Sequence, residues 1–182
     1  MFSLKVDDEI ELGLFEERHA QTLFTLTDQN REYLREWLAW VDFTRSSEDS
    51  KGFIKITMKQ VAENNGFQAG IWYKGELVGC IGYHYLEWST RRTEIGYWLG
   101  QAYTGHGIMT RTARKLTEYA FGELGLNRVE IRCAPGNRKS RAIPERLGFT
   151  QEGTLRQVGL VHDRLLEDLV VYGMLAAEWG KQ

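Results

Sequence analysis

Cysteine is scarce in this sequence, which has two, Cys80 and Cys133, among its 182 residues. Both lie in apolar runs, so we expect two reduced core thiols rather than a disulfide. Long apolar runs are missing as well, because no stretch reaches the length of about 20 residues that a membrane helix needs. The N-terminal segment 1–8 lacks the basic start and long apolar centre of a secretory signal peptide. These absences predict a cytoplasmic protein that does not bind a membrane.

Charge of one sign is not in excess either. The 23 Lys and Arg residues nearly balance the 25 Asp and Glu residues, for a net charge of −2, which argues against nucleic acid as a partner. A composition of 42% hydrophobic and 26% charged residues is that of an ordinary globular protein and excludes bulk disorder. At this length we expect a single domain over residues 1–182, which can bury a core without a disulfide or a metal.

The N-terminal part of the sequence predicts two short strands followed by helices. We expect strands at 3–6 and 10–14, and helices at 16–30, at 31–41 and from a hydroxyl-rich start at 44–47 to about 64–66. The second helix has apolar residues at positions i, i+3, i+4 and i+7, which are Leu34, Trp37, Leu38 and Val41. The third should bury Ile54, Met58 and Val61 on one face.

The rest of the sequence alternates between strands and helices. We expect strands at 67–73, 77–86, 93–99, 128–134, 149–155 and 165–172, a long helix from 108 to about 122–125 and a short one at 140–147. Strands joined by tight turns form an antiparallel meander. The unit of strand, helix and strand from 93 to 134 makes its two strands parallel neighbours. The predicted fold class is α+β, with a mixed, mostly antiparallel central sheet flanked by helices.

A loop with two glycines, Gly105 and Gly107, lies between a strand and the start of the long helix. Glycines let backbone N–H groups turn inward, and a helix N-terminus carries partial positive charge, so the loop suits a pyrophosphate. The alternative is a plain turn that needs positive φ. A P-loop is excluded because Ile108 and Met109 follow where Lys and Ser or Thr are needed. A dinucleotide fold would need a glycine where Thr110 stands.

The residues around this loop resemble a known family. Gln101-x-x-x-Gly105-His106-Gly107-Ile108-Met109 is similar to the pyrophosphate loop of the GNAT (Gcn5-related) N-acetyltransferases, and segment 94–99 is similar to their fourth strand. Segments 137–142, 145–149, 152–156 and 168–172 continue the pattern in order. The resemblance covers nearly the whole chain. It implies the GNAT fold, in which the sheet is splayed between the family's fourth and fifth strands.

One N-terminal motif narrows the resemblance to a branch. Asn30-Arg31-x-Tyr33-Leu34-x-x-Trp37-Leu38-x-Trp40 resembles the RimJ/RimL branch, which acetylates the N-termini of ribosomal proteins. The implied reaction transfers acetyl from acetyl-CoA to an amine, and the expected acceptor is the N-terminal α-amine of a ribosomal protein. A small-molecule amine (a polyamine, an amino acid or an antibiotic) and a non-catalytic acyl-CoA-binding sensor stay open as alternatives. The acyl group and the formation of a homodimer stay open too.

The resemblance also implies where acetyl-CoA binds. The loop and helix start offer N–H groups to the pyrophosphate, and the end of the fourth strand pairs with the pantetheine arm, with the Leu99 N–H facing the thioester oxygen. Asn137 contacts the pantetheine side or a bound water. The implied cofactor-binding residues are Trp98, Leu99, Thr104, Gly105, His106, Gly107, Ile108, Met109 and Asn137.

Two residues are implied as catalytic, Ser140 and Glu94. Ser140 stands where this branch places a hydroxyl near the thiol, and it would stabilise the leaving thiolate by a hydrogen bond, since a serine is a poor proton donor to a thiolate. Its alternative role is helix N-cap. Glu94 is the candidate base, acting through a water, and its alternative role is an ion pair with Arg91 or Arg92.

The sequence departs from the branch at one place. Some RimL-type enzymes have an acidic residue shortly after the sixth strand, whereas here Gln157-Val158-Gly159 follows and the next acid is Asp163. This leaves the base and the acceptor open.

Other conspicuous side chains have more ordinary explanations. The aromatic residues that are candidates for the acceptor cleft serve core packing equally well, and they are Tyr33, Trp37, Trp40 and Trp72. The histidines show no metal-ligand spacing, so we expect no metal, and they are His19, His84, His106 and His162.

Overall fold

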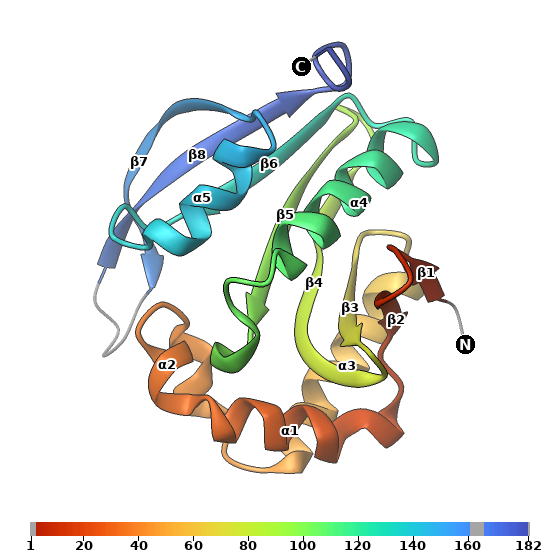
Figure 1. The fold of residues 1–182 in the computed structure, drawn as a ribbon, viewed down its shortest axis with the longest axis vertical. Coiled ribbons are helices and arrows are strands. Elements are labelled where there is room, and N and C mark those ends of the chain that lie inside the picture. The colour runs from red at the N-terminus through yellow and green to blue at the C-terminus, as the bar shows by residue number, and fades with distance from the viewer. Residues whose placement is uncertain (1–2, 161–165, 182) are drawn as a thin grey trace.

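A single mixed sheet forms the centre of the computed structural model, which describes residues 3–160 and 166–181 (Figure 1). The eight strands follow the order β1-β2-β3-β4-β5-β6-β8-β7. Every neighbouring pair is antiparallel except β5 and β6, which are parallel as the crossover predicted. The strands are β1 (Ser3–Lys5), β2 (Ile10–Leu14), β3 (Phe67–Tyr73), β4 (Glu76–Glu87), β5 (Arg92–Leu99), β6 (Arg128–Cys133), β7 (Thr150–Leu160) and β8 (Leu166–Leu175).

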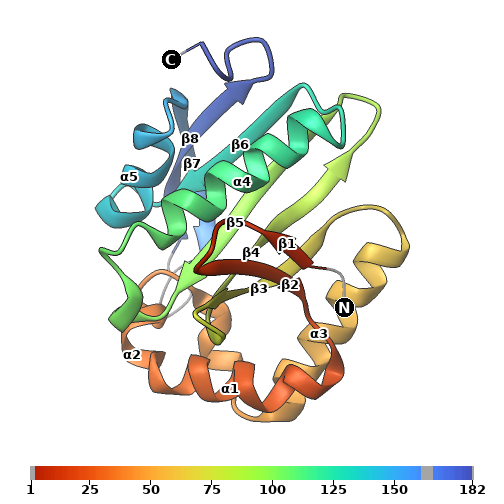
Figure 2. The same cartoon turned by 45° about the vertical axis from the view of Figure 1, so that its right-hand side comes forward.

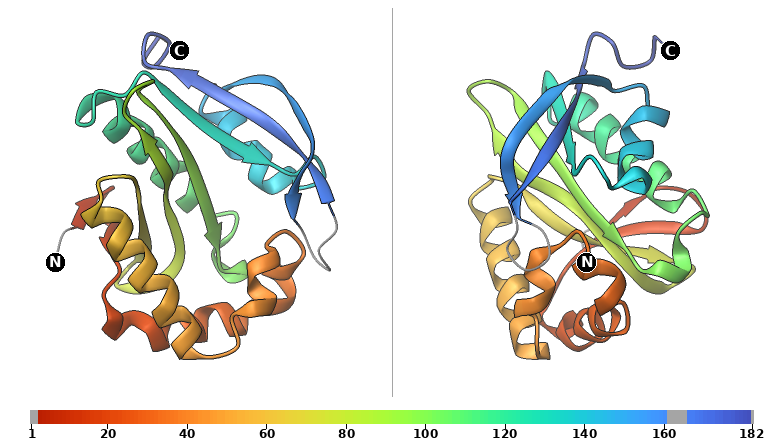
Figure 3. Two further views of the ribbon diagram at one scale, coloured as in Figure 1. Left: turned by 180° about the vertical axis from the view of Figure 1, so that it is seen from behind. Right: turned by 90° about the vertical axis from the view of Figure 1, so that its left-hand side faces the viewer.

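Helices cover both faces of this sheet. Helices α4 and α5 lie in front of it in Figure 1, and α3 lies over the other face, as the view from behind in Figure 3 shows. Figure 2 shows α4 running along the sheet above β5. The helices are α1 (Ala20–Gln29), α2 (Arg31–Arg35), α3 (Ser47–Ala62), α4 (Ile108–Gly122) and α5 (Arg138–Arg146), with 3₁₀ turns at Glu17–His19, Ala39–Phe43 and Gln101–Tyr103.

Alternation along β5 divides the core between the two faces. Ile95 and Leu99 belong to the larger cluster under α4, which supplies the fully buried Ala113 and Leu116. The Trp98 side chain points to the opposite face of the sheet and packs against the smaller cluster that α1 and α3 cover. The two faces of β5 can therefore serve different roles, because neighbouring side chains point to opposite sides of the sheet.

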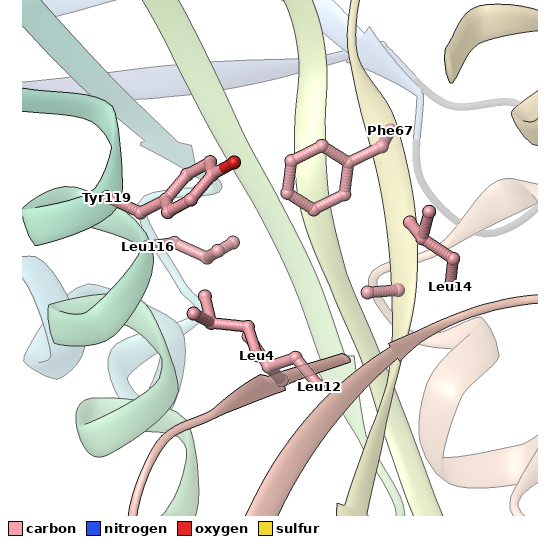
Figure 4. A pocket seen from close by; sticks show the side chains of 7 residues that line it. Leu4, Leu12, Leu14, Phe67, Leu116 and Tyr119 are labelled. Carbon is pink, nitrogen blue, oxygen red and sulfur yellow. The ribbon is translucent and has the colours of Figure 1, made fainter. Parts of the chain in front are cut away.

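Two hollows of the described residues lie on the β2–β3 side of the sheet. Figure 4 shows an apolar cleft of about 10 Å³, which is too small for a ligand. Its lining residues are Leu4, Leu12, Leu14, Phe67, Ala69, Leu116 and Tyr119. A hollow of about 260 Å³ opens beside α3, and Leu14, Phe15, Glu16, Thr57, Met58, Val61 and Gln68 line it.

Two expectations about the helices are wrong. The helix predicted over 31–41 stops at Arg35, and Leu38 is extended before a 3₁₀ turn. Tertiary contacts explain the break. The Arg31 guanidinium donates to the carbonyls of Val41 and Thr44 at 2.6 and 2.7 Å, which requires residues 41–44 to lie beside the start of α2 rather than further along a continuous helix. On α3, Ile54 is buried, but the two other residues of the predicted face, Met58 and Val61, remain 46% and 40% exposed. Ser50 and Thr57 complete the buried face instead.

The splay between β5 and β6 is confirmed. Their pairing covers only Arg92–Glu94 of β5, opposite Arg128–Glu130 of β6, and beyond this point the strands diverge (Figure 1). Gly100 N–H donates to Val78 O at 2.8 Å. Because such groups alternate along an antiparallel strand, the even-numbered residues of β5 bond to β4, while Tyr97 and Leu99 turn their N–H and C=O groups toward the gap.

Candidate active site

The glycine loop forms the N-terminus of α4. Gly107 is the N-cap with φ of 70°, and Gly105 has φ of 86°, a conformation that favours glycine. A Cβ at either position would meet no atom within 4 Å, so there is open space beside the loop at the start of this 15-residue helix, whose first N–H groups have no partner within the helix. An anion fits here because the helix dipole and these N–H groups act together.

Neighbouring contacts hold the loop in place. Thr104 Oγ1 donates to Gln101 O at 2.8 Å, and the Gln101 N–H donates to Asn30 Oδ1 at 2.8 Å, which ties the loop to the end of α1. His106 is exposed, whereas Ile108 and Met109 anchor the first helical turn in the core. Of the predicted cofactor-binding residues in this region, Gly105 and Gly107 of the loop and Ile108 and Met109 of the first helical turn lie together at the N-terminus of α4.

The free edge of β5 leads from this loop to the point where the strands part. At about 3.3 Å per residue, the five steps from Leu99 back to Glu94 span about 17 Å. An extended, amide-bearing chain can pair with the Tyr97 and Leu99 backbone along this edge as an added strand. Trp98, which the sequence placed in the same set, turns its backbone toward β4 and its ring toward α1 and α3.

Three side chains meet beside the gap on the α5 face. Ser140 Oγ lies 3.2 Å from Cys133 Sγ and donates to the Tyr97 hydroxyl at 3.3 Å. The Tyr97 hydroxyl in turn donates to Ser140 O at 3.0 Å. Burial raises the pKa of the Tyr97 phenol and of the Cys133 thiol. This cluster therefore consists of neutral groups with protons to donate, which suits a developing anion.

Ser140 is not the N-cap that its alternative role required. Helix α5 begins at Arg138, and the Asn137 side chain is the cap, because its Oδ1 accepts the Ser140 N–H at 3.1 Å. The Ser140 hydroxyl is thereby left for the Tyr97–Cys133 cluster.

Loss of the Asn137 cap should lower stability. We expect Asn137→Ala to cost about 1 kcal/mol, because one N–H of the first turn loses its acceptor. Asn137→Asp keeps an acceptor oxygen and should leave the free energy of unfolding unchanged or raise it. Urea unfolding of the two variants measures this difference, and equal stabilities would contradict the cap.

Glu94 lies on the opposite face of β5, with its side chain 14% exposed. Its Oε2 is 3.3 Å from Arg132 Nε, and its Oε1 is 3.3 Å from His84 Nδ1. Its ion-pair partner is therefore Arg132 of β6 rather than the predicted Arg91 or Arg92. This pairing could not be read from sequence, because it depends on the register between two parallel strands.

A row of alternating charges continues from this pair across the sheet. Glu130 accepts from Arg132 at 2.8 Å and from Arg128 at 2.9 Å, and Arg128 also pairs with Glu152 of β7. Although burial opposes it, the two guanidinium groups hold the pKa of Glu130 below its ordinary value. The ion pair with Glu130 holds the Arg132 guanidinium in place, and Arg132 in turn holds the Glu94 carboxylate.

The aromatic residues near the N-terminus separate into two groups. Trp40 is 39% exposed and its ring lies 5.8 Å from that of Trp98, at the α2 end of the gap. Lys139 Nζ lies 5.2 Å from the centre of the Tyr33 ring. Trp72 instead packs edge-on against His19 within the smaller core, as the packing alternative predicted.

Four residues of this site were missed from sequence, namely Tyr97, Cys133, His84 and Arg132. Their only sequence signal is the alternation of side chains along a strand, and this places none of them until the register between β4, β5 and β6 is known.

The segment where the sequence departs from the branch lies on β7. There the Gln157 N–H donates to Asp168 Oδ1 at 2.9 Å, while Asp163 lies outside the described residues.

Within residues 3–160 and 166–181, no group of three or more His, Cys, Asp and Glu side chains is arranged to hold a metal. None of the helices in that part of the chain has the length and hydropathy of a membrane span.

Comparison with known proteins identifies the architecture. A sequence profile of the acetyltransferase (GNAT) domain matches residues 9–150. The chain belongs to the GNAT acetyltransferase family. This GNAT chain is 43% identical over 180 residues to the Bacillus subtilis (strain 168) protein YdaF, provisionally named a ribosomal N-acetyltransferase, with 98% of both chains covered.

Two solved structures extend the comparison. The microcin C7 self-immunity acetyltransferase MccE, in complex with acetyl-CoA and AMP, is 31% identical with a TM-score of 0.89 and covers 94% of this chain and 95% of its own. A Salmonella typhimurium acetyltransferase that modifies the N-terminal serine of ribosomal protein L7/L12 is 26% identical with a TM-score of 0.86, covering 96% and 99%. The GNAT chain is thus an acetyltransferase with ribosomal-protein acetyltransferases among its relatives.

Proposed function

We propose that this enzyme transfers acetyl from acetyl-CoA to the N-terminal α-amine of a ribosomal protein. One observation carries the proposal, namely the free edge of β5, which joins the anion site at Gly107 to the neutral cluster around Ser140. In acetyl-CoA, a pyrophosphate, an amide-bearing arm and a thioester follow one another. This is the order of the anion site, the free edge of β5 and the Ser140 cluster along the protein. The relatives that act on ribosomal proteins support the acceptor.

Each chemical need of the transfer then has a group to meet it. The Leu99 N–H faces the gap and would bind the thioester oxygen, with Asn137 beside the pantetheine arm. The Ser140 hydroxyl would stabilise the leaving thiolate by a hydrogen bond. An α-amine, with a pKa of about 7.7–8.0, is partly neutral at pH 7 and so needs less help than lysine does.

We propose that residues 1–182 act as one catalytic domain in the cytoplasm, where ribosomal proteins are made. Selectivity for the acceptor would then come from segment 30–44, which contains Trp40, and from the hairpin of β7 and β8. No separate substrate domain would be needed.

A small-molecule amine is a second candidate acceptor. It is favoured by the similarity to MccE, whose structure contains AMP beside acetyl-CoA. The exposed Trp40 ring offers a stacking surface to a planar ligand as readily as to a peptide.

Release of the CoA thiol decides between these acceptors. Peptides with the N-terminal sequences of ribosomal proteins, polyamines and aminoglycosides are offered in parallel, and kcat/KM is compared. We expect peptides with free N-termini to be the best substrates, and the same peptides with blocked N-termini to release no thiol. A higher kcat/KM for any small amine would favour the second acceptor.

A further inference from the structure

His84 of β4 lies directly over Gly96 of β5, on the face opposite the Ser140 cluster. A Cβ at Gly96 would overlap the imidazole ring, with Nε2 as the nearest atom. The two residues are brought together by the antiparallel register, which pairs Gly82 with Gly96 just before an irregularity in β4. Glycine at position 96 therefore makes room for this ring beside the gap.

Glu94 holds the imidazole in a defined orientation. Nδ1 of His84 is 3.3 Å from Glu94 Oε1. A proton on Nδ1 in this contact leaves the lone pair on Nε2, the atom over Gly96. The arrangement is a carboxylate and an imidazole in series, with Nε2 as the acceptor atom over Gly96, where β5 and β6 part.

Access favours His84 over Glu94 as the group that meets an acceptor. The His84 side chain is 53% exposed, against 14% for Glu94. Both Glu94 oxygens already have partners, Arg132 on one side and His84 on the other. An amine that approaches from solvent on this face reaches the imidazole first.

The surroundings of His84 come from four elements. Glu94 faces it from β5, and Arg132 of β6 lies behind that carboxylate. From α3, the neutral Gln60 amide donates to the His84 carbonyl at 2.7 Å, and neutral Gln68 lies on β3 opposite Gly82. The acidic partner is therefore the one in contact with the ring, which suits an imidazole that becomes positively charged.

We propose that His84 is the catalytic base and that Glu94 is its positioning residue. This inference rests on the proposed function. As the amine nitrogen bonds to the thioester carbon, its proton passes to His84 Nε2, directly or through one water. The C–S bond then breaks, its electron pair leaves on sulfur within reach of the Ser140 hydroxyl, and solvent returns the thiolate to the thiol and His84 to its neutral form.

The test is the pH dependence of kcat/KM for a peptide with a free N-terminus. An amine and an enzyme base must each lose a proton before transfer, so log(kcat/KM) should rise with slope two at the acid end of the profile in the native enzyme. His84→Gln should lower the rate at pH 7 about 100-fold and reduce the slope to one, which the amine alone supplies. Glu94→Gln should lower the rate about tenfold with slope two retained, because a glutamine oxygen still accepts from Nδ1.

Controls separate this inference from the function it rests on. Glu87→Gln, on a half-buried carboxylate at the end of the same strand that accepts hydrogen bonds from Ser89, should match the native enzyme in rate and slope. Calorimetry should give native acetyl-CoA affinity for His84→Gln. Slope two in His84→Gln, or slope one in the native enzyme, would overturn the role of His84 while leaving acetyl transfer intact. A native chain that acetylates no amine would instead remove the proposed function, and His84 as its base.

Discussion

A Gly107→Val variant is expected to bind acetyl-CoA at least about 100-fold more weakly than the native chain, a loss of about 2.8 kcal/mol. Gly107 has φ of 70°, which a β-branched residue resists. Its Cβ would enter the open space in front of α4, where the phosphates would lie. Two hydrogen bonds to a charged group, at about 1.5–3 kcal/mol each, account for this loss. Isothermal calorimetry with acetyl-CoA measures it.

Gly125 supplies a matched control beyond the other end of the same helix. It also has positive φ, 62°, and a Cβ there would likewise meet no atom within 4 Å. Gly125→Val should therefore carry a similar backbone strain and lower the unfolding midpoint, yet bind acetyl-CoA with native affinity. Equal affinities for the two variants would show that the loop at Gly107 does not hold the pyrophosphate.

Replacement of Ser140 with alanine is expected to lower kcat about 100-fold with little change in KM. The hydroxyl lies beside the gap with Cys133 and Tyr97, and it would make its strongest hydrogen bond only when sulfur carries negative charge. Such an interaction stabilises the transition state more than bound acetyl-CoA. Steady-state kinetics with a fixed peptide acceptor measure both constants.

Ser89 offers the control for this substitution, since it lies in the turn between β4 and β5 and bonds to Glu87. Ser89→Ala should keep native kcat and KM. A Ser140→Ala enzyme with native kcat would show that the leaving thiolate depends on another group.

Elements with strong local patterns could be predicted from sequence. The strand Phe67–Tyr73 has the expected bounds, and the helix that starts after Gly107 begins where the glycine loop predicted. The parallel neighbours β5 and β6 followed from the crossover rule. The segment 31–41 failed because its apolar stripe favours one helix, whereas the contacts of Arg31 with distant carbonyls favour a break.

The candidate site likewise has residues that a local pattern predicts and residues that only long-range contacts bring together. Gly105 and Gly107 could be found locally, since a turn and a helix start lie in one stretch of chain. The contact of Ser140 with Tyr97 spans 43 residues, and that of His84 with Glu94 joins two strands through a register with an irregularity in it. Such contacts depend on how the sheet twists and splays, which residue patterns do not specify. Asn137 was expected at the coenzyme, and its role as the helix cap also escaped sequence reasoning.

The most direct test of the account follows the acetyl group itself. The enzyme is incubated with acetyl-CoA carrying an isotopically labelled acetyl group and a peptide that has both a free N-terminus and an internal lysine, and the product is sequenced by tandem mass spectrometry. We expect labelled acetyl on the N-terminal nitrogen and an unmodified lysine, as acetyl transfer to the N-terminal α-amine requires. Label on the lysine alone, or no labelled peptide from a chain that binds acetyl-CoA, would contradict it.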